Sequence, residues 1–471
     1  MTQTRAVAAI DLGATSGRVV VGRVGDGVLE TETVARFAND PVRLGDGLHW
    51  DVTGLYAAVL RGLREAFRAE PRLASIGVDS WAVDYGLLRE GQLLGVPFHY
   101  RDERTARGVV AVERTIGRAD LFARNGLQFL PFTTAHQLAA EPPGVLALAD
   151  TLLLMPDLLA FWLTGIRRAE LTNASTTGLL DARTRTWDDG LVSAIGVPRT
   201  LLPALISPGE RIGDLLPHVR AAVGGSAPVV AVGSHDTASA VVAVPMHADA
   251  AAYISCGTWG LVGVEVAQPV LSPEVSAANV TNEGGVDGRV RLLHNVMGLW
   301  ILTETIRGWS RRGEDADLGA LLAAAAEVPA SAVPVFDVDD ARFLTPGDMP
   351  ARIDAWCDEH GLASPKTRPA YVRAIIESLA QAFADAVSTT SRLGRVDVRT
   401  VHLVGGGALN ELLCQRTADR TGMPVVAGPV EATALGNVLV QARAAGMISG
   451  ALEELRDLVA RTHTLRRYEP R

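Results

Sequence analysis

The sequence AVAAIDLGATSGRVVVGRV (residues 6–24) contains two apolar runs separated by a short polar segment. The polar segment is DLGATSG (residues 11–17), and the whole pattern predicts strand, tight turn and strand. Glycines tolerate unusual backbone angles, so N–H groups of such a turn can converge on an anion. Asp11 ends the first strand, and a carboxylate beside phosphates implies a divalent cation between them. An ordinary hairpin with a polar tip is the alternative interpretation.

A second segment of the same kind, AYISCGTWGLVGVE, occupies residues 252–265. It again predicts strand, turn and strand, and its turn is rich in glycine and hydroxyl residues: Ser255, Gly257, Thr258 and Gly260. Two phosphate-type hairpins about half a chain apart predict two halves of related build that close on one nucleotide.

Length and composition limit the class of protein. The 471 residues predict two or three domains, and 48% hydrophobic with 21% charged residues is typical of globular proteins. The net charge of −9 and the lack of a basic run argue against nucleic acid as a partner. Three widely spaced cysteines without a CxxC motif predict a reducing compartment, with neither a disulfide scaffold nor a zinc site. They are Cys256, Cys357 and Cys414.

No membrane segment is expected. Asp11 and Arg18 interrupt any apolar region long enough for a cleavable signal. The most apolar later stretch, residues 145–163, contains two aspartates and a proline, so it predicts a buried helix rather than a membrane span. The expected location is cytoplasmic, with no membrane partner.

The first half of the chain predicts further strands and a helix. A strand is expected at residues 28–37, a helix from Asp51, and a strand at residues 73–79. The loop at residues 80–84 follows a strand end and is a candidate for ligand contact, since strand ends in α/β sheets open onto crevices. Alternatively, Trp81 fills the core beside a capped turn. Three charged residues further on could hold hydroxyls or form a solvated loop: Arg101, Asp102 and Arg104.

Asp236 lies in PVVAVGSHDTASAVVAV (residues 228–244), which predicts a buried strand, a polar turn and a helix of small residues. Its position at or near the helix N-terminus is typical of an N-cap. The functional interpretation is a base exposed in a cleft, with His235 and Thr237 as neighbouring hydrogen-bonding groups. The second hairpin follows about twenty residues on. A carboxylate just before a phosphate turn is what phosphoryl transfer needs.

The second half is expected to begin after a link at residues 244–249. Residues 294–304 predict an amphipathic helix, with Asn295 near its start and Thr303 as a further polar exception. A long helix is expected at residues 369–393. Residues 401–419 predict a strand, a triple glycine and a helix, an arrangement that lets an adenine ring or a phosphate approach the backbone.

The predicted last helix, EATALGNVLVQARAAG (residues 431–446), carries Gly436, for which close packing is the usual reason. A dinucleotide-binding fingerprint is disfavoured because Asn410 stands where its third glycine belongs. The chain has no GxxxxGK[ST] motif, and its one lysine, Lys366, lies in a Pro-flanked loop. The protein-kinase motifs are also missing. What remains is an ATP fold that grips phosphates with two hairpins and the base with a glycine turn.

Five motifs in this order resemble the FGGY family of carbohydrate kinases, whose fold belongs with actin and hexokinase: DLGATSGR, SHDTASA, SCGTWG, GGGALN and EATALGN. The likeness runs along nearly the whole chain. It implies an α/β protein with two related domains of the ribonuclease H-like ATPase fold and an interdomain cleft. Residues 1–244 would hold the sugar site, the first phosphate hairpin and the catalytic aspartate. Residues 245–471 would hold the second phosphate hairpin and the adenine site.

Three further stretches resemble the branch of the family that phosphorylates L-rhamnulose: residues 125–138, 154–165 and 278–300. This likeness implies ATP-dependent phosphorylation of L-rhamnulose at O1, as a step of L-rhamnose catabolism, with ATP and Mg²⁺ as cofactors. The alternatives are a kinase for another ketose, such as L-fuculose or xylulose, or a non-catalytic regulator that binds sugar and ATP.

The resemblance also implies roles for individual residues. Asp236 would take the proton from the sugar hydroxyl. The ATP site would comprise Ala14, Thr15, Ser16, Gly17, Arg18, Thr258, Thr303 and Gly406. The sugar would be held by Ala82, His235, Asp236, Thr237 and Asn295, and magnesium by Asp11 through water. The family has glycine where this chain has Ala82, so an extra methyl group could alter the accepted sugar.

Overall fold

β1 (Arg5–Leu12) and β2 (Ser16–Gly25) form the predicted hairpin, in a computed structural model that describes residues 4–314 and 316–471. β1 is buried from Ala6 onward, as its apolar sequence requires. It pairs antiparallel with β2 and parallel with β6 (Leu73–Ser80), so it lies in the interior of a sheet. A strand buried in this way reads as a continuous apolar run.

Contacts divide the chain into two compact units. Unit 1 contains the chain up to Pro245 together with Val266–Leu292 and Ala432–His463. Unit 2 contains Met246–Glu265, Leu293–Glu431 and Thr464–Arg471. The assignment of functional roles to residues 1–244 and 245–471 stays a prediction.

The main sheet of unit 1 has the order β12-β13-β6-β1-β2-β3. Its remaining strands are β3 (Val28–Ala38), β12 (Arg211–Asp214) and β13 (Pro228–Val230). α1 (Val52–Ala69) begins after Asp51, whose carboxylate accepts a hydrogen bond from the Gly54 N–H at 2.9 Å. The helix buries the apolar face that its three-to-four-residue spacing predicts. The expected strand at residues 28–37 and the helix from Asp51 are confirmed.

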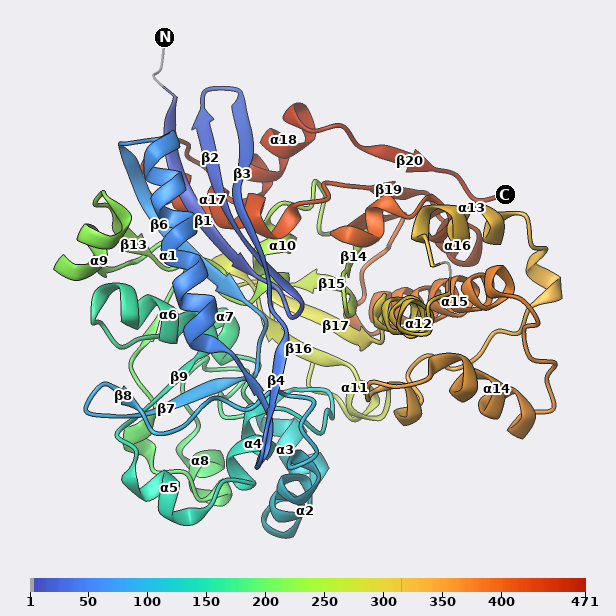
Figure 1. The fold of residues 1–471 in the computed structure, drawn as a ribbon, viewed down its shortest axis with the longest axis horizontal. Coiled ribbons are helices and arrows are strands. Elements are labelled where there is room, and N and C mark those ends of the chain that lie inside the picture. The colour runs from blue at the N-terminus through green and yellow to red at the C-terminus, as the bar shows by residue number, and fades with distance from the viewer. Residues whose placement is uncertain (1–3, 315) are drawn as a thin grey trace. The chain divides into compact units, whose positions relative to one another are not determined.

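Helices cover both faces of this sheet (Figure 1). α1 packs on β2 at Val19, and α17 (Ala432–Ala444) packs on β2 at Gly22. Side chains alternate between the faces of a strand, so positions 19 and 22 lie on opposite faces. α17 also contacts α10 (Asp236–Val242), where a Cβ on Gly436 would lie 1.7 Å from the Ser239 carbonyl oxygen. The close packing predicted for Gly436 is confirmed.

A smaller sheet of order β8-β7-β9 stands beside the helices of residues 105–195. Its strands are β7 (Tyr85–Arg89), β8 (Gln92–Leu93) and β9 (Thr151–Leu154). The helices are α2 (Thr105–Thr115), α3 (Arg118–Asn125), α4 (Thr134–Ala139), α5 (Pro143–Leu148), α6 (Met155–Thr164), α7 (Leu171–Ala174) and α8 (Asp189–Ile195). The prediction of one buried helix at residues 145–163 is wrong. β9 interrupts it because Thr151–Leu154 pairs antiparallel with β7.

The sheet of unit 2 contains strands in the order β17-β15-β14-β18-β19-β20. They are β14 (Ala251–Cys256), β15 (Gly260–Val266), β17 (Val290–Val296), β18 (Thr400–Val404), β19 (Val425–Ala427) and β20 (Arg466–Tyr468). β17 belongs to unit 2 only from Leu293 onward, because its first residues fall in the unit 1 segment Val266–Leu292. β14 pairs antiparallel with β15 and parallel with β18, which repeats the pairing of β1 with β2 and β6. The expectation of two halves of related build is confirmed at the level of sheet topology.

The helices of unit 2 include the predicted long one. They are α12 (Trp300–Arg311), α13 (Leu318–Ala326), α14 (Met349–Glu359), α15 (Arg368–Gly394) and α16 (Glu411–Thr421). The prediction of a helix at residues 294–304 is wrong at its start, because Asn295 still belongs to β17. Gly298 then lies so close to Trp259 that a Cβ would be 2.4 Å from its carbonyl carbon. The helix therefore begins only at Trp300.

The helix at residues 431–446 is not the last one, because α18 (Leu452–Thr462) follows it. α17 and α18 both belong to unit 1. None of the helices in the described parts of the chain combines the length and apolar character needed to span a bilayer.

Candidate active site

The first hairpin carries the five residues predicted to line phosphates, 14–18. Asp11 pairs with Arg18 across the strands, and the Gly13 N–H donates to the Ser16 carbonyl at 2.9 Å. Asn39 tightens the turn because its side-chain amide donates to the Gly13 carbonyl at 2.9 Å. The predicted strand–turn–strand structure is confirmed.

Three chain segments of unit 1 end side by side next to this hairpin. The Trp81 N–H donates to the Leu12 carbonyl at 3.1 Å, which joins the ends of β6 and β1. The Ser80 N–H donates to the Ser234 carbonyl at 2.9 Å, which joins β6 to the segment after β13. Carboxyl ends of parallel strands are where α/β sheets place ligands. Asp11 and Asp79 lie at two of these ends, and Asp236 follows the third.

The electrostatics of these ends are dominated by carboxylates. Burial raises the pKa of Asp11, although the Arg18 guanidinium, with Nε 3.0 Å from Oδ2, opposes the shift. Burial and the charge on Asp11 raise the pKa of Asp79 well above its usual value. Within residues 4–314 and 316–471, no group of three or more His, Cys, Asp or Glu side chains is arranged to hold a metal ion.

Asp236 is the first residue of α10, and His235 holds the capping position. The N-cap interpretation of Asp236 is therefore wrong. Its Oδ1 accepts hydrogen bonds from the Thr237 N–H at 2.5 Å and the Thr237 hydroxyl at 3.1 Å. Burial and the charge on Asp11 raise the pKa of Asp236 to about 7. A carboxyl that titrates near neutral pH has the properties of a general base.

His235 is buried and contacts Asp236, with Nε2 3.3 Å from Oδ1. On its other side, Nη2 of Arg291 lies 2.9 Å from Nδ1. Burial and the Arg291 charge lower the pKa of His235 well below its usual value, which favours the neutral ring. Arg291 also pairs with Glu283 at 3.1 Å.

Sequence reasoning did not single out Arg291 and Glu283. An arginine inside the apolar run VRLL was the available signal, because a buried charge in a strand needs a partner. Glu170 was also missed. Its buried carboxylate accepts hydrogen bonds from the Ser234 N–H at 3.0 Å and the Ser234 hydroxyl at 2.8 Å. It therefore fixes the backbone just before His235.

The loop at residues 80–84 is held by an aromatic cluster. Trp81 is 5% exposed and packs on Trp50 with ring centroids 4.1 Å apart. Both indole N–H groups donate to Oδ2 of Asp84, at 3.1 and 2.6 Å. Trp81 thus fills the core, as one of the two interpretations expected. Ala82, which lies between Trp81 and Asp84 in the chain, is half-buried.

The charged residues 101, 102 and 104 do not form a solvated loop, because all three are buried. Arg104 pairs with Glu141 at 2.8 Å, and its guanidinium lies 3.9 Å from the centroid of the Phe98 ring. Oδ2 of Asp102 accepts the Leu48 N–H at 2.7 Å. These contacts hold the three charged side chains in fixed positions.

In unit 2, the second hairpin lies at the start of α12. The Trp300 N–H donates to the Thr258 carbonyl at 3.2 Å, so the hairpin turn contacts the helix that carries Thr303. Asn295 lies near the end of β17, and β15 separates this strand from β14 in the sheet. The structure therefore brings the hairpin residue Thr258 to the helix of Thr303.

The triple glycine follows β18 as predicted, and its three residues differ in the space around them. Gly405 has φ of 81°, and a Cβ on it would lie 2.9 Å from the Cys256 carbonyl oxygen. A Cβ on Gly407 would lie 2.5 Å from the Cys256 sulfur. Gly406 has open space, with no such atom within 4 Å. Packing explains the outer two glycines, whereas no neighbouring atom within 4 Å would prevent a side chain at the middle one.

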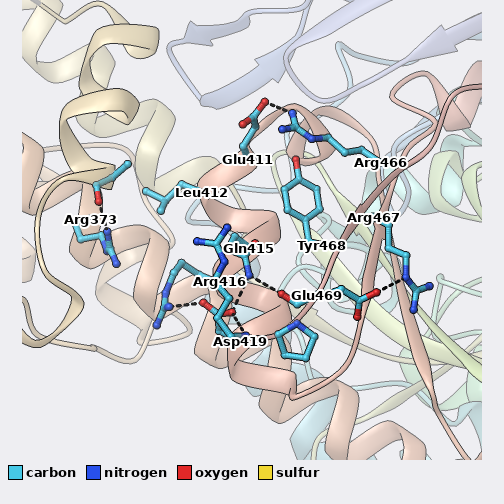
Figure 2. A pocket seen from close by; sticks show the side chains of 13 residues that line it. Arg373, Glu411, Leu412, Gln415, Arg416, Asp419, Arg466, Arg467, Tyr468 and Glu469 are labelled. Carbon is cyan, nitrogen blue, oxygen red and sulfur yellow. Dashed lines mark hydrogen bonds and ion pairs between the residues drawn. The ribbon is translucent and has the colours of Figure 1, made fainter.

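The structure also contains two cavities. One of about 300 Å³ in unit 1 is lined by residues that include Ser175, Asn282 and Glu283. The other, of about 710 Å³ in unit 2, lies between α16 and β20 (Figure 2). Its arginines face carboxylates, as in the pair Arg466 and Glu411. Neither cavity is lined by a predicted site residue.

Comparisons with known proteins assign the class. The N-terminal domain of the FGGY family of carbohydrate kinases matches residues 6–243, and the C-terminal domain of that family matches residues 252–445. The chain belongs to the FGGY family of carbohydrate kinases. The predictions of that family and of a sugar kinase are confirmed.

The chain is also similar to curated relatives along nearly its whole length. The chain is 40% identical to the rhamnulokinase of Pectobacterium atrosepticum, over 99% of this chain and 93% of the relative. It is 38% identical to the rhamnulokinase of Bacteroides thetaiotaomicron, over 98% of this chain and 95% of the relative.

Solved structures show the fold. Gluconate kinase from Lactobacillus acidophilus matches with a TM-score of 0.80 at 17% identity, covering 100% of this chain and 94% of that one. Xylulose kinase from the same species matches with a TM-score of 0.79 at 17% identity, covering 99% and 94%. The predicted α/β fold of two related domains is confirmed.

Proposed function

We propose that this protein transfers the γ-phosphoryl group of ATP to O1 of L-rhamnulose, giving L-rhamnulose 1-phosphate in L-rhamnose catabolism. The observation that carries the proposal is likeness to proteins named rhamnulokinase along 98–99% of the chain. The proposal includes a cytoplasmic location, which rests on the sequence alone. The oxygen–phosphorus bond to the sugar forms while the bond to ADP breaks, and the hydroxyl proton goes to the enzyme.

Asp236 is the proposed base. Its contacts with Thr237 and His235 all fall on Oδ1, so Oδ2 is the oxygen that would accept the hydroxyl proton. A pKa of about 7 makes the carboxylate basic enough to take a proton while it stays largely ionised at slightly alkaline pH. His235 and Thr237 would orient this carboxylate and the sugar.

The first hairpin is proposed to hold the phosphates through residues 14–18, with Arg18 as the charged member. Asp11 fits a magnesium site, because a carboxylate oxygen is the ligand that this ion prefers. The charge on Asp11 also raises the pKa values of Asp79 and Asp236, so a cation here would relieve repulsion. When bound, magnesium would neutralise charge on the phosphates.

Thr258, Thr303 and Gly406 of unit 2 are proposed to complete ATP binding. The open face of Gly406 supports this role, because a flat ring needs a backbone without a side chain. Ala82 and Asn295 are proposed sugar contacts. The departure at Ala82 keeps L-fuculose and xylulose as alternative substrates.

The deciding experiment is ADP release with ATP and magnesium across L-rhamnulose, L-fuculose, L- and D-xylulose, L-ribulose and glycerol. A preference for L-rhamnulose of about tenfold or more in kcat/KM corresponds to about 1.4 kcal/mol of transition-state binding and would support the proposal. A different preferred ketose would change the substrate but keep the reaction. Folded protein that binds ATP without turnover on any sugar would favour a non-catalytic regulator.

A further inference from the structure

We propose that Arg291 is a positioning residue, which fixes the tautomer of His235 and through it the carboxylate of Asp236. The proposal rests on the proposed function only in assigning Asp236 as the base. Its structural part concerns which nitrogen of His235 carries a proton.

The guanidinium of Arg291 determines the tautomer because it can only donate hydrogen bonds. Nη2 of Arg291 lies 2.9 Å from Nδ1 of His235, so Nδ1 must be the unprotonated, accepting nitrogen. The proton of the neutral ring then stands on Nε2, which lies 3.3 Å from Oδ1 of Asp236. The two ring nitrogens thus connect a buried arginine to the proposed base.

Arg291 is itself fixed in place. Its side chain is 0% exposed, Nη2 lies 3.1 Å from Oε2 of Glu283, and Nε donates to the Gly284 carbonyl at 3.1 Å. A guanidinium held on two sides keeps its orientation, because its donors form a rigid fork. Arg291 therefore aims one donor at His235 without needing a ligand.

Because Glu283 also lies near His235, the positive charge of Arg291 is needed to keep a proton off Nδ1 of His235. Oε2 of Glu283 lies 3.4 Å from Nδ1 of His235, so it would attract a proton to that nitrogen if Arg291 were missing. His235 would then stand between the carboxylates of Glu283 and Asp236, an arrangement that favours imidazolium. Thr172 also faces the histidine, with its hydroxyl oxygen 3.3 Å from the backbone N–H.

The consequence concerns the base. A positive imidazolium beside Asp236 would stabilise the ionised carboxylate and weaken it as a proton acceptor. A neutral Nε2–H group orients Oδ1 without adding a positive charge. Arg291 thus preserves both the direction and the basicity of Asp236.

The first test is the ¹⁵N and ¹H NMR spectrum of the wild-type protein with labelled histidine. The chain has 10 histidines. The signals of His235 are assigned by their loss in the His235→Gln variant. We expect a neutral ring with the proton on Nε2 across about pH 6–8, the range in which histidine usually titrates. A proton on Nδ1, or a ring that becomes charged in this range, would overturn the proposal. This result does not depend on which sugar is phosphorylated.

The second test replaces the arginine. Arg291→Met should make His235 titrate between about pH 6 and 8 and lower kcat by about 10- to 100-fold, with the KM for ATP within about twofold. Arg291→Lys keeps a charged donor and should recover most of the loss. If Arg291→Met does not fold, Arg291→Lys and the wild-type spectrum still decide.

Arg289→Met is the matched control, because Arg289 lies two residues away and pairs with Glu453 at 2.5 Å instead. It should leave kcat and the His235 spectrum unchanged. A folded Arg291→Met protein with normal kcat and a neutral Nε2–H ring would refute the positioning role. An expected spectrum without ketose phosphorylation would instead refute the proposed function and leave the tautomer assignment standing.

Discussion

The side-chain amide of Asn437 donates a hydrogen bond of 2.5 Å to Oδ2 of Asp79, although 358 residues separate them in the chain. Gln441 supports the contact, since its amide donates to Oδ1 of Asn437 at 2.6 Å and to the Ala8 carbonyl at 3.0 Å. The amides of α17 therefore fasten this helix to β1 and β6 in unit 1. The relationship gives the asparagine of EATALGN a structural role beside the proposed site.

Loss of this contact should weaken unit 1. Asn437→Leu leaves the buried carboxyl of Asp79 without its donor, so we expect a loss of about 1–3 kcal/mol in the free energy of unfolding. Urea titration measures it. The control is a double-mutant cycle with Asp79→Leu, in which the double variant should lose less than the sum of the two single losses. Strict additivity would mean that the hydrogen bond contributes nothing.

The contrast between Gly436 and Gly308 tests packing against helix propensity. A Cβ on Gly436 would lie 1.7 Å from the Ser239 carbonyl oxygen, whereas a Cβ on Gly308 in α12 would lie 3.8 Å from Nη1 of Arg312, an ordinary contact. Gly436→Ala should destabilise the protein by about 1–3 kcal/mol or more through overpacking. Gly308→Ala should stabilise it by up to about 1 kcal/mol, because alanine is the better helix former. Thermal unfolding that moves both variants in the same direction would contradict this interpretation.

The local features of the site were predictable and the distant ones were not. A glycine turn between apolar runs is determined by adjacent residues, so both hairpins and the glycine turn at residues 405–407 follow from the sequence. Arg291 and His235 are 56 residues apart, and no local pattern connects them. The helix predicted at residues 294–304 shows a further limit of prediction from the sequence. Its apolar spacing fits a helix, but the close approach of Gly298 to Trp259 delays the helix start.

Glu377 is the centre of an arginine cluster at the edge of the larger cavity. Its carboxylate is 0% exposed and pairs with Arg373, Arg416 and Arg420 at 2.7–2.9 Å. Glu377→Gln removes the carboxylate that these three guanidinium groups share, although Arg416 keeps a second carboxylate partner in Asp419. We expect a loss of about 2–4 kcal/mol in urea titration.

The control for Glu377 is Glu411→Gln, which breaks the pair with Arg466 drawn in Figure 2. Both partners of this pair are exposed, at 60% and 63%, so water screens their charges and the loss should be far smaller than in Glu377→Gln. Equal losses in the two variants would show that burial does not set the value of these pairs.

Asp236→Asn should separate catalysis from stability. Turnover should fall by about 10²–10⁴, the usual contribution of a positioned base, while the protein still binds ATP. In the wild type, kcat/KM should fall as the pH drops below about 7, because the protonated carboxyl cannot accept a proton. Near-normal turnover in the variant would exclude Asp236 as the base.

The Asp236 carboxyl should also lower the stability of the folded protein at high pH. Its pKa is about 7 in the folded protein against an ordinary 3.8, so the folded state binds the proton more tightly than the unfolded state. Wild-type stability therefore receives a penalty that grows as the pH rises through this interval. Asp236→Asn removes the penalty, and its melting temperature should exceed that of the wild type more at pH 8 than at pH 5. A difference that does not depend on pH would contradict the raised pKa.

The triple glycine offers the sharpest separation of ligand binding from packing. Gly406 has open space where a side chain would go, whereas a Cβ on Gly407 would lie 2.5 Å from the Cys256 sulfur. Gly406→Ala should therefore fold with an unchanged melting temperature but bind ATP about tenfold more weakly, a change of about 1.4 kcal/mol. Gly407→Ala should instead lose about 1–3 kcal/mol of stability through overpacking. Calorimetric titration with ATP and thermal unfolding measure the two effects. Wild-type ATP affinity in Gly406→Ala would remove this glycine from the nucleotide site, because a methyl group on the face of a bound ring cannot be neutral.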